Sequence, residues 1–341
     1  MTRLAKKGEP TAEADPNNPR AVIVTGARDA AEAYRVALRL RKATQTSADS
    51  STEPPLVATV NRRISAIKAE RLKDLQLRLF PELPDDRRAA PNAVVRSSVF
   101  GVVRRGKRAR VTEMQVAAPE GWEIAITGWR LDQHDLDIWL EIMHAAGGSK
   151  PGEEVRFQLH TLMKRLGHTS RGGTHDYDSL KSRLRQLTQT TVSFASGTLE
   201  GVAGAFFAAF AIDNATGEAV CITNPLLRPL FEDITHLDIE QRRALGGNQL
   251  AKALHVLLAS HAVWLPTRVD TLMRRVGAEY ANLRFFKRDL KVVLEDFLAR
   301  GWIRDYEFQP GGRGVELISI VKVPSPSQRR AIESRREQPS G

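Results

Sequence analysis

A self-match at constant register is the feature that most constrains how this chain folds. Residues 161–167, TLMKRLG, align with residues 271–277, TLMRRVG, 110 positions later in the sequence. The same offset holds downstream without a gap, where it pairs Leu180 with Leu290 and Leu184 with Leu294. A match of this length indicates two copies of one supersecondary unit. Because the copies are so far apart, they indicate two similar domains and not a solenoid of short repeats.

Each copy predicts the same order of elements: a helix, a short strand, a short helix, a glycine turn, a long helix and a β-hairpin. Gly167 and Gly277 stand where the chain must leave the short helix in a left-handed turn, which glycine tolerates. The long helices, expected over 174–189 and 282–300, each carry one apolar stripe. This order is typical of a winged helix-turn-helix. The predicted fold class is therefore α+β, with two tandem winged helix-turn-helix domains and a flexible N-terminal extension.

Domain organisation follows from changes in composition along the chain. Low apolar content with proline and Ser/Thr/Asp clusters predicts disorder at the N-terminus, and a polar C-terminus predicts a frayed tail. The wing of the first domain is expected within 191–212, whose AGAFFAAFAI run also suits a core or a protein contact. The predicted parts are a disordered extension (1–55), an amphipathic helix and linker (56–92), winged-helix domain 1 (93–225), winged-helix domain 2 (226–323) and a flexible tail (324–341).

The charge balance favours a polyanionic partner. Lys and Arg number 51 against 40 Asp and Glu, a formal net charge of +11. The single cysteine excludes a disulfide scaffold and a cysteine-based zinc module, and the eight histidines show no metal-ligand spacing. There is no Walker lysine motif, no convincing nucleophile and no apolar stretch long enough for a bilayer. We therefore expect a cytoplasmic double-stranded-DNA-binding protein without cofactor, metal, membrane partner or catalytic activity.

The free faces of the two long helices supply the candidate DNA contacts, because Arg side chains match guanine and Asn side chains match adenine in the major groove. Each candidate has the alternative of being an ordinary solvated helix position. A separate basic run is expected either to follow the phosphate backbone or to form a solvated hairpin tip. The candidates are Thr174, His175, Lys181, Ser182 and Arg185 on the first helix, Asn282, Arg284, Lys287, Arg288 and Lys291 on the second, and Arg104, Arg105, Lys107 and Arg108 in the basic run.

Several segments carry a resemblance to a known family. They read LKDLQLRLF (72–80), RSSVF (96–100), ITGWRLDQHDLDIWLEIM (126–143), FQLHTLMKRLG (157–167) and YDSLKSRLRQL (177–187). Through them, residues 72–323 resemble the TrfA family of plasmid replication initiators. The resemblance implies binding to iteron repeats at a plasmid origin, opening of an AT-rich segment whose single strand is a further candidate ligand, recruitment of the host DnaA protein and DnaB helicase, and exchange between dimer and monomer.

The family also has a QLxLF pentapeptide that docks on the polymerase sliding clamp. In this sequence it reads Gln76, Leu77, Arg78, Leu79 and Phe80, and the resemblance makes Gln76, Leu77, Leu79 and Phe80 the clamp-binding residues. Leu79 and Phe80 are expected to be exposed apolar anchors, of the kind that fill a hydrophobic pocket. The alternative is that Leu77, Leu79 and Phe80 pack against the first domain.

Three function classes compete. The first is an origin-binding replication initiator, which remodels DNA without catalysis. The second is a winged-helix transcriptional repressor without replication partners, which uses the same DNA chemistry. The third is an enzyme acting on nucleic acid, for which the sequence supplies no active-site motif.

Overall fold

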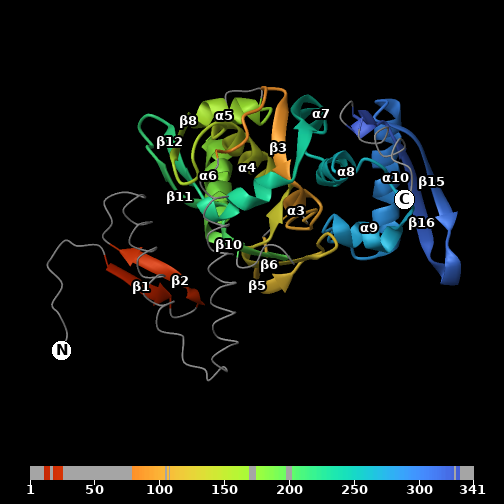
Figure 1. The fold of residues 1–341 in the computed structure, drawn as a ribbon, viewed down its shortest axis with the longest axis horizontal. Helices are drawn as coiled ribbons and strands as arrows, with labels where there is room; N and C mark the ends of the chain where they lie inside the picture. Colours follow the sequence, from red (N-terminus) through yellow and green to blue (C-terminus); the bar gives the residue numbers. More distant parts are fainter. Residues whose placement is uncertain are drawn as a thin grey trace, which may run out of the picture.

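The computed structural model describes residues 11–15, 18–25, 79–103, 106, 108–168, 174–196, 202–325 and 328–330. These residues mix helices and strands, as the α+β prediction requires. Figure 1 shows the middle of the chain gathered on one side and the C-terminal elements on the other. Residues 56–78 of the amphipathic helix expected over 56–80 lie outside the described residues, as do Gln76, Leu77, Arg104, Arg105 and Lys107.

The first copy of the repeat forms what we call the first unit. A helix, a strand, two helices and a hairpin follow one another along the chain. Its three strands make one antiparallel sheet, in which the last strand lies between the other two. The elements are α4 (Gln133–Ala145), β8 (Glu154–Gln158), α5 (Leu159–Arg165), α6 (Thr174–Gln189), β11 (Phe207–Ile212) and β12 (Glu218–Thr223).

The second copy forms the second unit, with the same order of elements and the same order of strands in its sheet. Its first strand has two residues, against five in the first unit. The elements are α8 (Gln249–Ala259), β14 (Thr267–Arg268), α9 (Val269–Arg275), α10 (Leu283–Ala299), β15 (Ile303–Pro310) and β16 (Glu316–Lys322), with a 3-10 turn, η2 (Gly312–Gly314), between the last two.

The first unit carries an insertion between α6 and β11, whereas the second unit passes directly from α10 to β15. The two inserted strands pair with each other, and one of them pairs with the nearer of two strands that precede the unit, in a separate four-stranded sheet (Figure 1). The prediction of a wing within 191–212 is therefore wrong for its first half, and the hairpin of the first unit is β11–β12. The sheet contains β10 (Val202–Ala205), β9 (Thr191–Ser196), β6 (Trp122–Trp129) and β5 (Arg110–Gln115), in that order.

A buried aromatic ring explains why the apolar run divides into two strands. Phe206 stands between β10 and β11, and its ring lies 4.9 Å from that of Phe100 and 5.0 Å from that of Trp139. This contact fixes the chain in the core at the point where it passes from one sheet to the other. Phe206 and Phe207 of the run AGAFFAAFAI are buried in the core, and Phe210 and Ile212 pack against it, so the run takes up one of the two roles predicted for it.

The remaining elements connect the units. The expectation of disorder over 1–55 is wrong for two segments that pair as an antiparallel hairpin, β1 (Thr11–Asp15) and β2 (Asn18–Thr25), the second of which ends in a β-branched run. The other elements are β3 (Arg87–Pro91), which pairs with β13 (Ile234–Asp238), β4 (Phe100–Gly101), which pairs with β7 (Leu131–Asp132), the helices α3 (Asn92–Val95) and α7 (Ile239–Ala244), and the 3-10 helix η1 (Pro225–Glu232).

Two apolar clusters form the cores. The larger extends from Phe80 to Val256 and includes the insertion, and the smaller extends from Leu245 to Ile320 and fills the second unit. The tail is not wholly free, because Gln328 donates to the backbone carbonyls of Ala259 and His261 at 2.7 and 3.2 Å.

Candidate nucleic-acid interface

Helix α6 buries one face and exposes the other, as the repeat predicts. Leu180, Leu184 and Leu187 are buried in the larger cluster, because their spacing of three and four residues puts them on one side of the helix. The opposite side exposes His175, Ser182 and Arg185, together with Asp178. This free face is open to a ligand, so His175, Ser182 and Arg185 remain available as candidate contacts.

Helix α10 repeats this arrangement in the second unit. Phe286, Leu290, Leu294 and Phe297 are buried, while Arg284, Arg288 and Lys291 are exposed. Asn282 is the N-cap, and its side-chain oxygen accepts from the backbone N–H of Phe285 at 3.1 Å. This bond satisfies one of the donors that a helix start leaves unpaired. The sequence prediction overlooked two exposed apolar residues on the same face, Phe285 and Val292.

Two predicted contacts, Lys181 and Lys287, instead join each long helix to its own hairpin. Lys181 Nζ donates to Asn214 Oδ1 at 2.9 Å, in the turn between β11 and β12. Lys287 pairs with Glu316 of β16 and lies 4.8 Å over the ring of Phe308. Both lysines therefore have acceptors within the protein, on the hairpins of their own units.

Arg108, the described member of the basic run, is not free to follow phosphate. Its guanidinium donates to Asp132 at 2.6 Å, to Asp135 at 2.5 Å and to Gln186 of α6 at 2.6 Å. The prediction is wrong here because the two aspartates are buried and require cations. The LDQHDLD segment carries the missed signal: Asp132 and Asp135 form the capping box that begins α4.

The same two aspartates hold the back of α6 through Arg183, which donates to Asp132 at 2.9 Å and to Asp135 at 3.0 Å. Burial opposes ionisation of Asp132, but Arg183 and Arg108 outweigh it and lower its pKa. Burial, together with the charge of Asp132, raises the pKa of Asp135 to about 6. We call Asp132, Asp135, Arg108 and Arg183 the aspartate–arginine network. It fixes α6 and one end of the basic run to α4.

A second ionic cluster joins the two units. Asp137 of α4 pairs with Arg242 and, at 2.6 Å, with Lys252 Nζ of α8. Burial alone would raise the pKa of Asp137, but Arg242 and Lys252 outweigh it and hold the pKa below its ordinary value. Three charges buried together without this pairing would be strongly unfavourable, so the cluster commits α4 and α8 to one relative position.

Backbone contacts hold the same junction. The N–H of Val102 donates to the carbonyls of Val276 and Gly277, and the N–H of Glu279 donates to the carbonyl of Val102, all at 3.1 Å. Gly277 has φ +57, the left-handed turn predicted for it, and Gly167 has φ +91 at the matching position. Gly277 also lies so close to Gly101 that a Cβ on either residue would meet the other's backbone within 3.0 Å.

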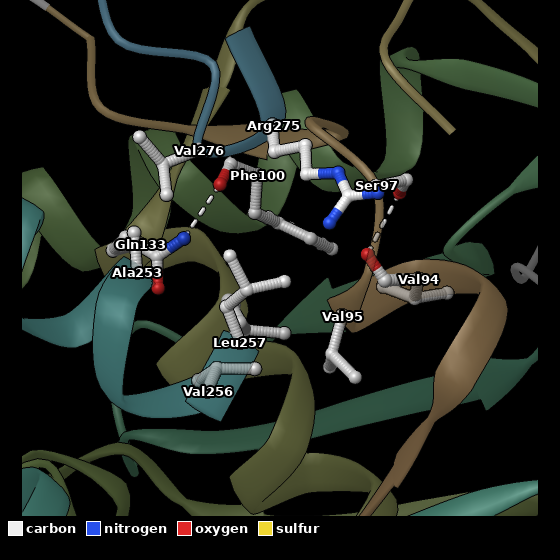
Figure 2. A pocket seen from close by; sticks show the side chains of 11 residues that line it. Val94, Val95, Ser97, Phe100, Gln133, Ala253, Val256, Leu257, Arg275 and Val276 are labelled. Atoms are coloured by element: carbon white, nitrogen blue, oxygen red, sulfur yellow. Dashed lines mark hydrogen bonds between the residues drawn. The ribbon is translucent and has the colours of Figure 1, made fainter. Parts of the chain in front are cut away.

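Packing at the junction is dense on one side and open on the other. Figure 2 shows side chains from α3, α4, α8 and α9 converging on a space of about 10 Å³, no larger than one water needs. Beside it, an open groove of about 690 Å³ runs between β5 and α9, lined in part by Arg130, Arg274 and Arg275. Arg274 and Arg275 are exposed in this groove, whereas Arg130 is buried.

The structure corrects the description of the clamp peptide. Leu79 is 50% exposed, as expected, but Phe80 is only 2% exposed. Its ring lies 5.3 Å from that of Phe231, and its backbone exchanges hydrogen bonds with Gly148 and Ser149. The prediction that Phe80 is an exposed anchor is wrong, because the core of the first unit offers it an apolar pocket.

Within the described residues, no cluster of three or more His, Cys, Asp or Glu has metal-binding geometry. No helix in that part of the chain has the length and apolar character that crossing a membrane demands. The candidate site lies on the exposed faces of α6 and α10, whose side chains are mostly basic and polar.

Comparison with known proteins gives the chain its relatives. A family model described as TrfA protein matches residues 57–301. Among solved structures, the chain is similar to the Pi initiator protein in complex with iteron DNA, with 16% identity, a TM-score of 0.44 and coverage of 57% of this chain and 94% of that one. It is also similar to domains 2 and 3 of RctB, with 14% identity, a TM-score of 0.46 and coverage of 68% and 98%. No curated protein matches the chain.

Proposed function

The chain belongs to the TrfA family, and we propose that it is a plasmid replication initiator that binds iteron repeats through two winged-helix units. One observation carries the proposal: two units with the same element order each expose the free face of a long helix. A helix of this kind fits the major groove of B-DNA. The net charge of +11 supplies the attraction to phosphate.

The roles of individual residues follow from their exposure. Arg185 on α6 and Arg284, Arg288 and Lys291 on α10 are exposed and supply base or phosphate contacts. Arg274 and Arg275, in the groove between the units, hold the backbone between the two half-sites. Lys181, Lys287 and Arg108 act indirectly, by orienting the elements that make these contacts.

Binding of several copies to repeated sites would bend and strain the DNA, and that strain lowers the free energy needed to melt an adjacent AT-rich segment. The protein then acts without catalysis of its own and without a cofactor. Host replication proteins would be recruited to the opened segment. A repressor that used the same helices would bind the repeats and leave the duplex closed, which separates the two functions experimentally.

The test combines binding and opening. Using fluorescence anisotropy on a duplex that carries the direct repeats expected beside this gene, we expect affinity to fall about 10³- to 10⁵-fold between 50 and 200 mM salt, as for roughly 6–10 phosphate contacts. Arg288→Ala should weaken binding by about 1–3 kcal/mol. Its matched control is Arg300→Ala, at the far end of the same helix and paired with Asp296 at 2.8 Å, which should bind as the wild type does.

Permanganate footprinting on a supercoiled plasmid with the same repeats tests initiation. Reactive thymines in the neighbouring AT-rich segment are expected only when the protein is bound. Binding without such reactivity would favour the repressor. A flat salt response would contradict groove binding by both helices.

A further inference from the structure

Two apolar side chains interrupt the cationic face of α10. Phe285 is 44% exposed and Val292 is 64% exposed. With 3.6 residues per turn, both lie along one edge of the exposed face, Arg284 and Lys291 lie along the other, and Arg288 lies between. Single exposed apolar residues are ordinary on protein surfaces. Here two exposed apolar residues lie beside three cations on a helix that is proposed to enter the DNA groove. This arrangement favours a ligand that itself carries apolar groups.

The surroundings of Phe285 indicate which apolar group of the DNA it contacts. The guanidinium carbon of Arg288 lies 5.6 Å from the centroid of the Phe285 ring. Arg288 Nε donates to Asp289 Oδ1 at 2.8 Å, which leaves its exposed terminal N–H groups for a base. An apolar ring and a planar donor therefore lie side by side. In the major groove, arginine donates to guanine, and the only apolar group on a base edge is the 5-methyl of thymine. The pair thus matches a thymine next to a guanine.

The repeat provides an internal comparison. At the offset of 110 residues, Phe285 corresponds to His175, Arg288 to Asp178 and Val292 to Ser182. The same positions on α6 are therefore polar or acidic, although both helices have the same exposed face. The apolar stripe is shared, since Leu180, Leu184 and Leu187 correspond to Leu290, Leu294 and Phe297. Because these three exposed positions differ, the two helices present different chemistry to DNA.

We propose that Phe285 and Val292 read thymine methyl groups in the major groove, which makes the half-site of α10 different in sequence from that of α6. The inference rests on the proposed function, since it needs α10 to bind DNA. It follows that one chain binds an asymmetric site in one orientation, as a direct repeat requires and a palindrome does not.

The experiment begins with the full chain and a library of random duplexes, from which bound sequences are selected and read. In the selected duplex, each thymine is then replaced singly by deoxyuridine, which lacks only the 5-methyl. For the wild type we expect about fourfold weaker binding at one or two positions in one half-site, the value of one buried methyl group, and no change elsewhere. The double variant Phe285→Ala/Val292→Ala should be insensitive to deoxyuridine at those positions.

Leu298→Ala is the matched control, because Leu298 is 37% exposed on the last turn of the same helix. It should keep the wild-type pattern. The proposal is overturned if deoxyuridine leaves wild-type affinity unchanged at every thymine, or if the double variant keeps the wild-type response. The deoxyuridine measurement on the wild type is decisive even if the double variant does not fold. A wild-type chain that enriches no sequence would overturn the DNA-binding function itself, and this outcome is distinct from the other two.

Discussion

Alanine substitution at the two repeated glycines separates the strain of a turn from the packing of the junction. Both residues have positive φ, +91 at Gly167 and +57 at Gly277. A Cβ at Gly167 would meet nothing within 4 Å, whereas at Gly277 it would lie 2.9 Å from Ser98 Cβ and 3.0 Å from Gly101 Cα. The two positions therefore share the backbone penalty and differ in steric contact.

The magnitudes follow from these distances. Left-handed backbone costs an alanine about 1–2 kcal/mol, so Gly167→Ala should lose about that much free energy of unfolding. Gly277→Ala also forces the new Cβ against Ser98 and Gly101, which the junction holds in place. This overpacking should lower the free energy of unfolding by about 1–3 kcal/mol more. Its total loss should be about 2–5 kcal/mol, even though +57 is the less strained φ of the two.

Urea unfolding followed by circular dichroism measures both losses against the wild type. The matched pair controls for the turn, because each glycine ends the same short helix in its own unit. If Gly277→Ala loses no more stability than Gly167→Ala, the close approach at the junction does not contribute as we argue.

Three further predictions concern buried groups. Asp137→Ala leaves Arg242 and Lys252 without their buried partner and should lower the free energy of unfolding in urea melts by about 3–5 kcal/mol. The control is Asp296→Ala, which breaks an exposed pair with Arg300 and should lower it by at most about 1 kcal/mol. Equal losses would contradict the argument. By the same assay, Phe80→Ala should lower the free energy of unfolding by about 3–5 kcal/mol and Leu79→Ala by about 0.5 kcal/mol or less. Leu79 is therefore the residue with which to test clamp binding without unfolding the protein. An unchanged stability in Phe80→Ala would show that its pocket contributes little. Burial lowers the pKa of His255 to about 3, so the unfolded chain takes up a proton below pH 6.5 while the folded chain does not, and the protein loses about 2 kcal/mol of stability from this group by pH 5. Because Asp135 acts with the opposite sign, the quantity to measure is the stability of the wild type minus that of His255→Gln, from pH 7 to 5. A difference that stays constant over this range would refute the assignment.

The repeat made much of the fold predictable. Leu180 and Leu184 align with Leu290 and Leu294, and periodicity alone assigned their faces correctly because burial of a helix stripe is a local pattern. The turn glycines followed from the same alignment, since a left-handed residue at the end of a helix is a local requirement.

What the sequence did not reveal depends on distant partners. Arg108 looked like a free cation because its acceptors, Asp132 and Asp135, come to it only after folding, and Phe80 looked exposed because its pocket includes Phe231. The insertion β9–β10 was missed because Phe206, the residue that divides the apolar run, has the same polarity as its neighbours. Phe285 and Val292 were missed because a search for polar contacts passes over apolar residues.

The hydrogen bonds between Val102 and the turn at Gly277 have a consequence for the DNA on which such a protein would act. If α6 and α10 are held at a fixed separation, the two half-sites must also lie at a fixed distance along the duplex. Each base pair added between the half-sites shifts one half-site by about 3.4 Å and rotates it by about a tenth of a turn around the duplex axis. Mutations that lengthen or shorten the spacer would then weaken binding as much as changes to the base pairs that the helices contact. On this basis, spacer length in the plasmid's repeats should drift more slowly over generations than the sequence of the spacer itself.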